Sequence, residues 1–504
     1  MAGLNDLLGQ GRRVERHAPW PRALVDAAMW ERVAAEIAEG AWTLLGLWGD
    51  TGAVHMALLD EPAGAVGVIT LDCPAGRFPS VARHHPPALR LERAAADLFG
   101  LQPDGLPDPR PWLDHGRWGV RHPLGDRAPA SPDGQAYPFL ASEGESLHQI
   151  PVGPVHAGII EPGHFRFTAN GETMVRLEER LGYVHKGIEG LMAGAGLDHA
   201  VRLAGRTSGD SSVAYALAAA RAAEAALAIA PPPRAVWLRA LMAELERLAN
   251  HFGDVGAVCN DAAFALMHAH CGILRERVLR AADACFGHRL MRDRIVPGGV
   301  AADLDEAGTR EIRALVAEAR RHFPALVRLY DGTASLQDRT VGTGTLRPAL
   351  ARLYGAGGHV GRASGRAFDA RRALAYPPYD ALAFEVPVLQ EGDVNARVWI
   401  RIREVEQSLS LVEQIVAGLP AGALRVAVTP ADEPREGMAV VEAFRGDVLA
   451  WLRLAADGTV ARCHLRDASW FQWPLLEAVI EGNIVADFPL CNKSFNCSYS
   501  GHDL

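Results

Sequence analysis

The hydrophobic pattern of the chain changes its period across one segment, residues 127–150, and this change constrains the fold more than any other feature. Before the segment, apolar residues come in short runs of the kind that form strands. After it, they recur every three to four residues over long stretches, as they do in helices. The segment itself is rich in Pro, Ser, Gly and Ala without a sustained period, which is typical of a linker.

The pattern therefore predicts an α+β fold built from two domains of different character. A chain of 504 residues also favours more than one domain, because a single hydrophobic core rarely grows that large. We expect a small α+β domain over residues 1–125, a linker over 126–150 and a mainly α-helical bundle over 151–504.

In the first domain, the apolar period predicts an amphipathic helix over residues 21–39 and another over 90–99, with Gly100 where helices commonly end. Turn residues between them separate three β-type runs that predict a meander. These runs cover residues 41–48, 53–59 and 66–71.

In the second domain, a strand pair is predicted around residues 164–168, with Gly171 in its turn. Long helical periods follow, and the tail from residue 424 mixes short strands, one helix and an irregular end. The predicted helices cover residues 173–192, 211–229, 234–252, 262–286, 305–323 and 396–417.

Composition excludes several classes. The net charge of −9 and the scattered Lys and Arg argue against a nucleic-acid partner. Seven cysteines, an odd number without a C-x-x-C spacing, argue against a disulfide framework. Residues 1–19 lack the apolar core of a signal peptide. The most apolar stretch, 211–231, carries Arg221 and Glu224 near its middle, so a buried helix is favoured over a membrane span.

Common catalytic signatures do not occur: the chain has no G-x-S-x-G, no P-loop and no helical H-E-x-x-H. His268, His270 and Cys271 are close in sequence, but on a helix they point in different directions. They are therefore not expected to converge on one metal ion.

Residues 91–123 contain the pattern E-R-x-x-x-D-x-x-G-x followed by P-D-x-R. This pattern resembles the C-type subunit of NADH-quinone oxidoreductase, which is complex I. The matching residues are Glu92, Arg93, Asp97, Gly100, Pro107, Asp108 and Arg110.

Further blocks resemble the D-type subunit of complex I and the related large subunit of [NiFe]-hydrogenases, in the order that the family has them. These blocks cover residues 153–156 (GPVH), 181–189 (LGYVHKGIE), 244–251 (ELERLANH), 362–371, 392–404 and 494–504. Fusion of a C-type and a D-type part in one chain is similar to the large subunits of formate hydrogenlyase and hydrogenase-4.

The resemblance implies a helical bundle, like that of the D-type protein, packed against a small iron–sulfur subunit that carries the terminal [4Fe–4S] cluster. Membrane-arm subunits would hold this pair peripherally on the cytoplasmic side of the inner membrane. In complex I, to which NAD binding also belongs, the cavity between the two subunits takes a quinone. In hydrogenases the same cavity holds nickel and iron.

The nickel ligands of the family are not present. Hydrogenases use two C-x-x-C motifs, and the resemblance places these four positions on Ser208, Ser211, Ser498 and Gly501. Soft metals prefer ionised thiolates, whereas a hydroxyl is a harder and much less acidic ligand. We therefore expect no nickel, and we expect this chain itself to bind no cofactor. Cys491 and Cys497 are near the second motif but shifted from it.

The quinone ligands of complex I are also incomplete. His156 matches one of the two histidines in the family's first hairpin, but the second falls on Ile160 or Pro162, with His164 nearby but out of register. The family's quinone-facing Tyr has no clear counterpart around residues 208–211. Quinone as the acceptor therefore rests on the context of the complex.

Two polar sets are retained. Arg206 matches the family's Arg beside the terminal cluster, where a cation raises the cluster potential; the alternative is a salt-bridged surface Arg. Beside it, Asp210 with Ser208 and Ser211 predicts either a proton or water path or a helix N-cap.

The second retained set is Tyr183, His185 and Glu189. On a helix His185 and Glu189 would form an ordinary i,i+4 pair, which is the alternative to a role in the cavity.

These features predict the large subunit of a complex I-like, hydrogenase-4-related oxidoreductase that couples electron transfer to ion translocation. Two alternatives stay open: a non-catalytic scaffold subunit of such a complex, and a group 4 [NiFe] hydrogenase with unusual ligands. The electron donor, the acceptor and the pumped ion are not encoded in any motif.

Overall fold

The computed structural model describes residues 3–129, 136–156, 158 and 160–504. The N-terminal part is built on a five-stranded sheet in the order β1-β3-β6-β5-β4. Its helices are α1 Leu4–Leu8, α2 Ala27–Ala38 and α3 Leu89–Phe99, and β7 Arg77–Pro79 pairs with β8 Gln102–Asp104. The sheet strands are β1 Arg12–Arg13, β3 Arg22–Val25, β4 Thr43–Asp50, β5 Ala53–Asp60 and β6 Ala65–Asp72.

The predicted meander is confirmed, since β4, β5 and β6 are consecutive antiparallel strands. The helix α3 also ends where the sequence predicted, because Gly100 adopts a φ of 75° and closes the helix in the left-handed conformation. The helix expected over 21–39 starts later, at Ala27. The preceding residues form β3, which pairs in parallel with β6.

A three-stranded antiparallel sheet follows, made of β11 Leu147–Val152, β12 His164–Asn170 and β13 Thr173–Arg180. The strand β11 starts within the expected linker 126–150. Near the start of this linker, β10 Ala128–Pro129 pairs with β9 Val120–Arg121, which precedes it. Residues 130–135, in the middle of that linker, lie outside the described residues.

The helix predicted over residues 173–192 is wrong in its first half, which forms the strand β13. Pairing with β12 satisfies the backbone groups of this segment. Gly182 and Gly187, with φ of 97° and 69°, break any helical continuation. Only α4, Ile188–Met192, is helical.

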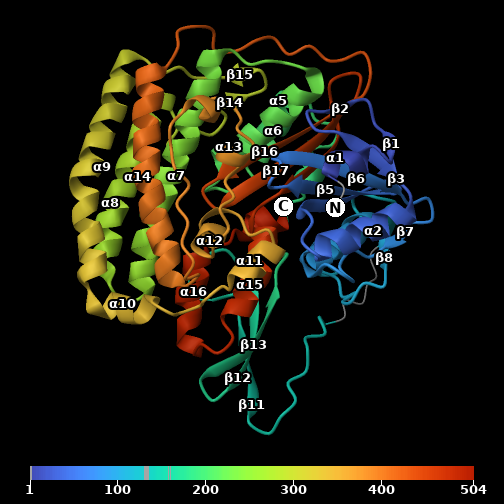
Figure 1. Ribbon diagram of the computed structural model, residues 1–504, viewed down its shortest axis with the longest axis horizontal. Helices are drawn as coiled ribbons and strands as arrows, with labels where there is room; N and C mark the ends of the chain where they lie inside the picture. Colours follow the sequence, from blue (N-terminus) through green and yellow to red (C-terminus); the bar gives the residue numbers. More distant parts are fainter. Residues whose placement is uncertain (1–2, 130–135, 157, 159) are drawn as a thin grey trace.

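The long helices form a bundle that lies at the left in Figure 1. Pro233 starts α7 at its first turn, where the missing N–H costs nothing. The predicted helices after residue 211 are confirmed, although α7 and α9 are longer than expected. The main helices are α5 Leu197–Ala204, α6 Ser212–Leu227, α7 Pro233–Asp261, α8 Ala265–Phe286, α9 Glu306–Gly332 and α14 Val394–Gly418.

Shorter elements connect the bundle helices. They are β14 Ile295–Val296, β15 Gly299–Val300, α10 Ala334–Thr340, α11 Pro348–Leu353, α12 Gly358–Ala363 and α13 Ala370–Ala373. Short 3₁₀ turns also occur at Pro86–Ala88, Tyr379–Ala381 and Val485–Asp487.

The C-terminal part forms a second sheet, β16 Arg435–Ala443, β17 Gly446–Leu454 and β18 Val460–Arg466, on which α6 packs. The tail was expected to end irregularly, and this expectation is wrong. It forms α15 Ser469–Val479, α16 Phe488–Phe495 and α17 Tyr499–Asp503, and its last residues are buried. Burial of the final residues fixes them as helix, because buried backbone groups need hydrogen-bond partners.

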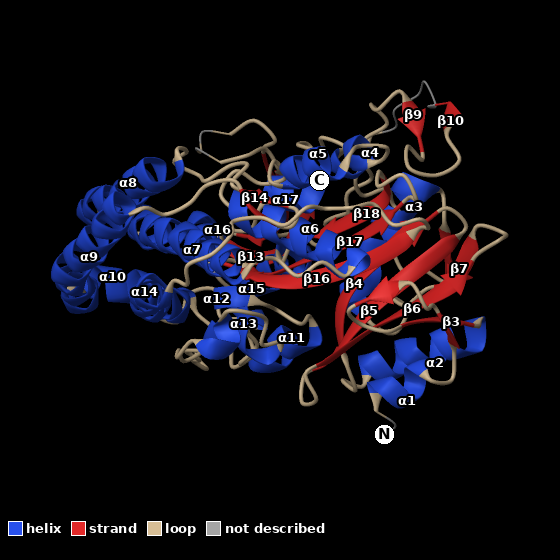
Figure 2. Cartoon of the chain, turned by 90° about the horizontal axis from the view of Figure 1, so that it is seen from above, coloured by secondary structure: helices blue, strands red, loops and turns tan. Residues whose placement is uncertain are grey.

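The two parts share one continuous hydrophobic core. The short strand β2, His17–Ala18, pairs in parallel with β16 and joins the second sheet. Trp48 on β4 and Trp451 on β17 lie 5.7 Å apart between their ring centroids. Figure 2 shows β4 beside β17, where the two sheets meet. The division into domains at 125 and 150 stays a prediction, but the parts on either side of it are packed together.

Among the helices of the described residues, none is long and apolar enough to cross a membrane.

Candidate functional site

Four positions that the resemblance assigned to nickel ligands come together in the fold. Ser208 lies in the loop between α5 and α6, Ser211 lies at the start of α6, and Ser498 and Gly501 belong to the cap and body of α17. The hydroxyl oxygens of Ser208 and Ser498 are 3.0 Å apart, and the Gly501 N–H donates to Ser498 Oγ at 2.8 Å. Residues far apart in the sequence thus form a single serine cluster.

An ion pair accompanies the serine cluster. Asp210 accepts a hydrogen bond from Ser208 Oγ at 2.7 Å and another from Arg445 Nη1 at 2.8 Å. Arg445, buried just after β16, also donates to Ser211 Oγ at 3.2 Å. Although burial opposes ionisation, the Arg445 charge and its hydrogen bonds lower the pKa of Asp210 to about 2. Asp210 therefore stays ionised at neutral pH.

The N-cap alternative for Asp210 is wrong. Ser211 occupies the N-cap position of α6 and makes no side-chain cap. Instead, the side-chain oxygens of Glu246 on α7 accept from the backbone N–H groups of Val213 and Ala214, at 2.7 and 3.1 Å. Burial raises the pKa of Glu246 to about 8, with the negative charge of Asp210 contributing in the same direction.

The fourth position, Gly501, has no room for a side chain. A Cβ atom there would lie 2.6 Å from Asp467 Oδ2 and 2.9 Å from Ser498 Oγ. Asp467 is held in place by the Tyr215 hydroxyl, which donates to the same Oδ2 atom at 2.8 Å. A carboxylate therefore occupies the space that a fourth ligand would need.

The residues present do not fit nickel. The serine cluster offers hydroxyls and an ion-paired carboxylate, which are hard ligands. The nearby thiols are not thiolates, because burial raises the pKa of Cys491 to about 12 and that of Cys497 well above its usual value. Within the part of the chain that the structure describes, no three His, Cys, Asp or Glu residues are grouped to hold a metal ion.

A cavity of about 270 Å³ opens beside the serine cluster, between α7, α8 and the loop at 289–291. Asp210 and Glu246 line it, together with Arg275, Arg289 and apolar residues of the two helices. The site therefore combines a fixed negative charge, a carboxyl group that is mostly protonated at pH 7 and an access route.

Arg206 lies on the outer side of the same loop. Its side chain is 37% exposed and forms a two-pronged ion pair with Asp293, at 2.9 and 2.8 Å. The salt-bridged alternative thus describes its contacts in this chain. Its exposure still leaves the guanidinium accessible to a partner on this face.

His185 and Glu189, of the set with Tyr183, do not form a helical i,i+4 pair, so that alternative is wrong. Gly187 interrupts the backbone, and only Glu189 lies on α4. His185 Nδ1 donates to the carbonyl of Asp503 at 2.7 Å, and Tyr183 packs edge-on against His115 on the surface.

Glu189 points elsewhere, into the protein. It accepts from Arg462 and His464, both at 2.9 Å. It therefore ties α4 to β18.

The hairpin histidines do not form a pair at the serine cluster. His156 contacts its own loop, with the Gly158 N–H donating to its Nδ1 at 3.1 Å. His164 is buried and donates from Nδ1 to the carbonyl of Gly153 at 2.9 Å. Glu161, between them, reaches the C-terminal helix by accepting from the Ser500 N–H at 3.0 Å.

Three of the family-like blocks meet in a buried charge network. Glu244 on α7 pairs with Arg371 at 3.0 Å, and His251 on the same helix bonds Glu404 of α14 at 2.7 Å. Glu404 also pairs with Arg362 at 2.7 Å. These motif residues hold the bundle together, so their presence in this chain serves the fold.

Sequence reasoning missed Arg445, Asp467, Glu246 and Glu161 as parts of the site. Glu246 lies inside the family-like block 244–251, which could have indicated it. No short motif marked the other three, because each reaches the serine cluster or its loops from a distant part of the chain. Asp210 and Arg445, for example, are 235 positions apart.

The chain matches the family described as respiratory-chain NADH dehydrogenase, 30 Kd subunit, over residues 53–133, and the corresponding 49 Kd subunit family over residues 261–437. It is 32% identical to formate hydrogenlyase subunit 5 of Escherichia coli, over 86% of this chain and 78% of that protein. It is 30% identical to hydrogenase-4 component G of the same organism, over 90% and 80% of the two chains.

The chain is also 30% identical to a D-type NADH-quinone oxidoreductase protein of Syntrophobacter fumaroxidans, over 69% of this chain and 94% of that one. Among solved structures, it resembles a chain of the membrane-bound sulfane sulfur reductase, described as an archaeal respiratory membrane complex. That match has a TM-score of 0.68 and 25% identity, and it covers 72% of this chain and all of the other, 100%.

Proposed function

Because the chain belongs to the family of fused C-type and D-type subunits related to complex I, formate hydrogenlyase and hydrogenase-4, we propose that it is the large subunit of a membrane-associated oxidoreductase complex. The observation that carries the proposal is similarity along nearly the whole chain, 90% of it for hydrogenase-4 component G. The serine cluster marks the place in this subunit where electrons leave for an acceptor.

The partner at this place is a small iron–sulfur subunit with a [4Fe–4S] cluster. The exposed side of Arg206 supports the assignment, since the same loop places Ser208 inside the chain and a cation on the surface. Membrane-arm subunits hold the pair on the cytoplasmic side of the inner membrane and move ions as electrons pass. The relatives that are subunits of multisubunit complexes support this arrangement.

The acceptor enters the cavity beside Asp210, and the aliphatic side chains that α7 and α8 contribute to its wall support a quinone. Reduction of a quinone takes up protons. Glu246 carries a proton at pH 7, because its pKa is raised to about 8, and its carboxyl lines the same cavity. Asp210 cannot take this role, because the Arg445 charge keeps it ionised.

The test uses the native complex, purified and assayed with quinones, formate and hydrogen. We expect quinone-dependent electron transfer, less than about a tenth of an equivalent of nickel, and no hydrogen turnover with viologen dyes, because hydroxyls bind soft metals weakly. Stoichiometric nickel together with hydrogen turnover would contradict the proposal and favour the hydrogenase alternative.

One observation favours a second candidate function, the non-catalytic scaffold. Asp467 fills the space at Gly501, and the Arg445–Asp210 ion pair occupies the centre of the serine cluster. A Glu246→Gln variant separates the two functions. It should slow electron transfer to quinone at pH 7 while leaving assembly of the complex intact. If the subunit is a non-catalytic scaffold, the wild-type and Glu246→Gln complexes should show the same rate of electron transfer, or none.

A further inference from the structure

A second cavity, of about 380 Å³, lies between α6, the start of α7 and the turn at residues 376–381. Its walls are mainly apolar and aromatic, with Leu217, Trp237 and Tyr376 among them. The cavity has the size of pockets that take small organic molecules. None of the residues assigned above to electron transfer lines it.

One cation in this cavity lacks a counter-ion among the described residues. The Nε atom of Arg221 on α6 is buried and has no hydrogen-bond partner within that part of the chain. Its guanidinium lies 4.5 Å from the centroid of the Tyr376 ring, which stabilises the cation only modestly. In residues 3–129, 136–156, 158 and 160–504, no carboxylate forms an ion pair with Arg221. Burial is the largest cause that lowers the pKa of this guanidinium.

The other charged residues of the cavity do not compensate for Arg221. Glu224 is bound by Arg239 through two hydrogen bonds of 2.9 and 2.6 Å, so these two charges cancel each other. Glu224 also accepts from the Gly298 N–H at 2.8 Å. Asp380 is exposed to solvent on the turn and makes no ion pair with Arg221. Arg221 is partly exposed at this cavity, so an anionic ligand that enters can reach the guanidinium and supply the missing partner.

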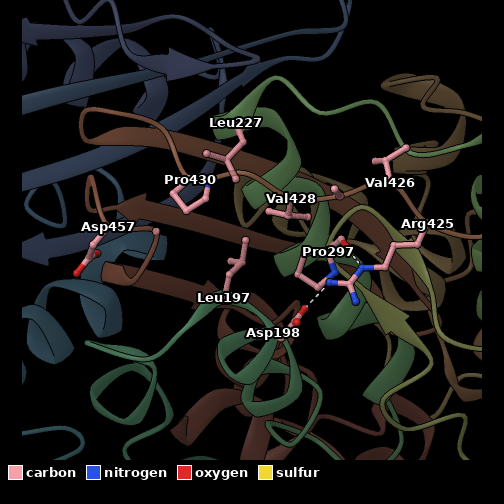
Figure 3. A pocket seen from close by; sticks show the side chains of 11 residues that line it. Leu197, Asp198, Leu227, Pro297, Arg425, Val426, Val428, Pro430 and Asp457 are labelled. Atoms are coloured by element: carbon pink, nitrogen blue, oxygen red, sulfur yellow. Dashed lines mark hydrogen bonds and ion pairs between the residues drawn. The ribbon is translucent and has the colours of Figure 1, made fainter.

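A larger hollow of about 500 Å³, shown in Figure 3, provides the contrast. It also contains an arginine, Arg425, but this side chain already has a counter-ion. Arg425 pairs with Asp198 at 2.8 Å and donates to the Pro297 carbonyl at 3.0 Å. The cation in the hollow of Figure 3 is therefore already neutralised, whereas the one at Arg221 is available to an anion.

We propose that the cavity at Arg221 binds a small organic carboxylate with an aromatic body. The carboxylate pairs with the guanidinium through charge-assisted hydrogen bonds, and the body packs against Trp237 and Tyr376. This binding site is separate from the proposed redox function and does not depend on it. It would give the subunit a small-molecule ligand of its own.

The test compares two isosteric probes on the purified full-length protein, in its complex where the complex is stable. Isothermal titration calorimetry should show 3-phenylpropionate binding at least about tenfold more tightly than the neutral 3-phenylpropanamide, since only the first can pair with Arg221. The Arg221→Gln variant should lose this preference, and Arg221→Lys should keep part of it. Arg425→Gln removes the paired cation of the other hollow and should leave both affinities unchanged.

Equal binding of the two probes, unchanged binding of the carboxylate by Arg221→Gln, or no saturable binding of the carboxylate at millimolar concentration would each overturn the proposal. The comparison of probes on the unmodified protein does not depend on whether the variants fold. A preference that Arg425→Gln abolishes would move the site to the hollow of Figure 3 and would overturn the assignment as well.

Discussion

Replacing Glu189 with Gln removes one buried charge that joins three parts of the structure. Glu189 is 4% exposed and accepts from Arg462, from His464 and from the Leu465 N–H. Arg462 in turn donates to the carbonyl of Gly49 at 3.1 Å, in the N-terminal sheet. The variant therefore leaves Arg462 buried between the two sheets without a counter-ion.

The size of the effect follows from the pKa of Glu189. Burial opposes its ionisation, but the charge of Arg462 and the hydrogen bonds lower the pKa from 4.5 to about 2. A shift of this size corresponds to about 3 kcal/mol of stability, which is also the scale for breaking a buried ion pair. Burial lowers the pKa of His464, while its contact with Glu189 opposes that shift. For a chain of 504 residues, about 3 kcal/mol lowers Tm by about 3 °C.

Scanning calorimetry of the wild-type and Glu189→Gln proteins measures this difference as a function of pH. Because the folded-state pKa is depressed, the stabilisation is fully present above the unfolded pKa of about 4.5 and is lost as pH falls toward 2. The gap in Tm should therefore stay constant from pH 8 to about 5.5 and narrow below about 4.5.

The matched control is Glu276→Gln on α8, whose carboxylate is exposed and pairs with Arg280 and Arg289 on the surface. It should leave Tm unchanged, because exposed ion pairs contribute little. A Glu189→Gln protein as stable as wild type, or a Tm gap that widens on acidification, would refute the assignment of this charge as a stabilising buried pair.

Three further outcomes are expected. Protease Glu-C should first cut at Glu143 and Glu145, which are exposed, and the two fragments should still co-elute in native size-exclusion chromatography because they share one core. Arg206→Met should lower the midpoint potential of the cluster in the proposed iron–sulfur partner, measured by redox-titrated EPR, and Asp293→Asn should raise it, because the two changes remove charges of opposite sign. Gly501→Cys should lower Tm by about 1–3 °C, because a Cβ atom meets a carboxylate oxygen at 2.6 Å.

Each of these has a clear contrary result. An N-terminal fragment that elutes alone as a compact piece would show that the two parts are independent domains. An unchanged potential in both Arg206→Met and Asp293→Asn would make their ion pair structural only. A Gly501→Cys protein as stable as the wild type would mean that the site can relax.

The sequence by itself determined the local elements and the family. The spacing of apolar residues in strands and helices can be read from the sequence, so the meander at 43–72 and the helix ending at Gly100 could be predicted within a few residues. The spacing of motif residues identified the four ligand positions and showed that their residue types are wrong for nickel. These inferences need only neighbours in sequence, because periodicity and ligand chemistry are local properties.

Only the tertiary structure decided which distant groups meet. The segment 173–180 has a pattern that suits a helix, but pairing with β12 made it a strand. Asp210 could have capped α6, but its carboxylate binds Arg445 instead. Glu246 accepts the hydrogen bond from the first turn of α6. Side chains like these come from segments far apart in the chain. Burial forces each charge to find a partner, and the choice of partner depends on three-dimensional proximity that no local pattern records.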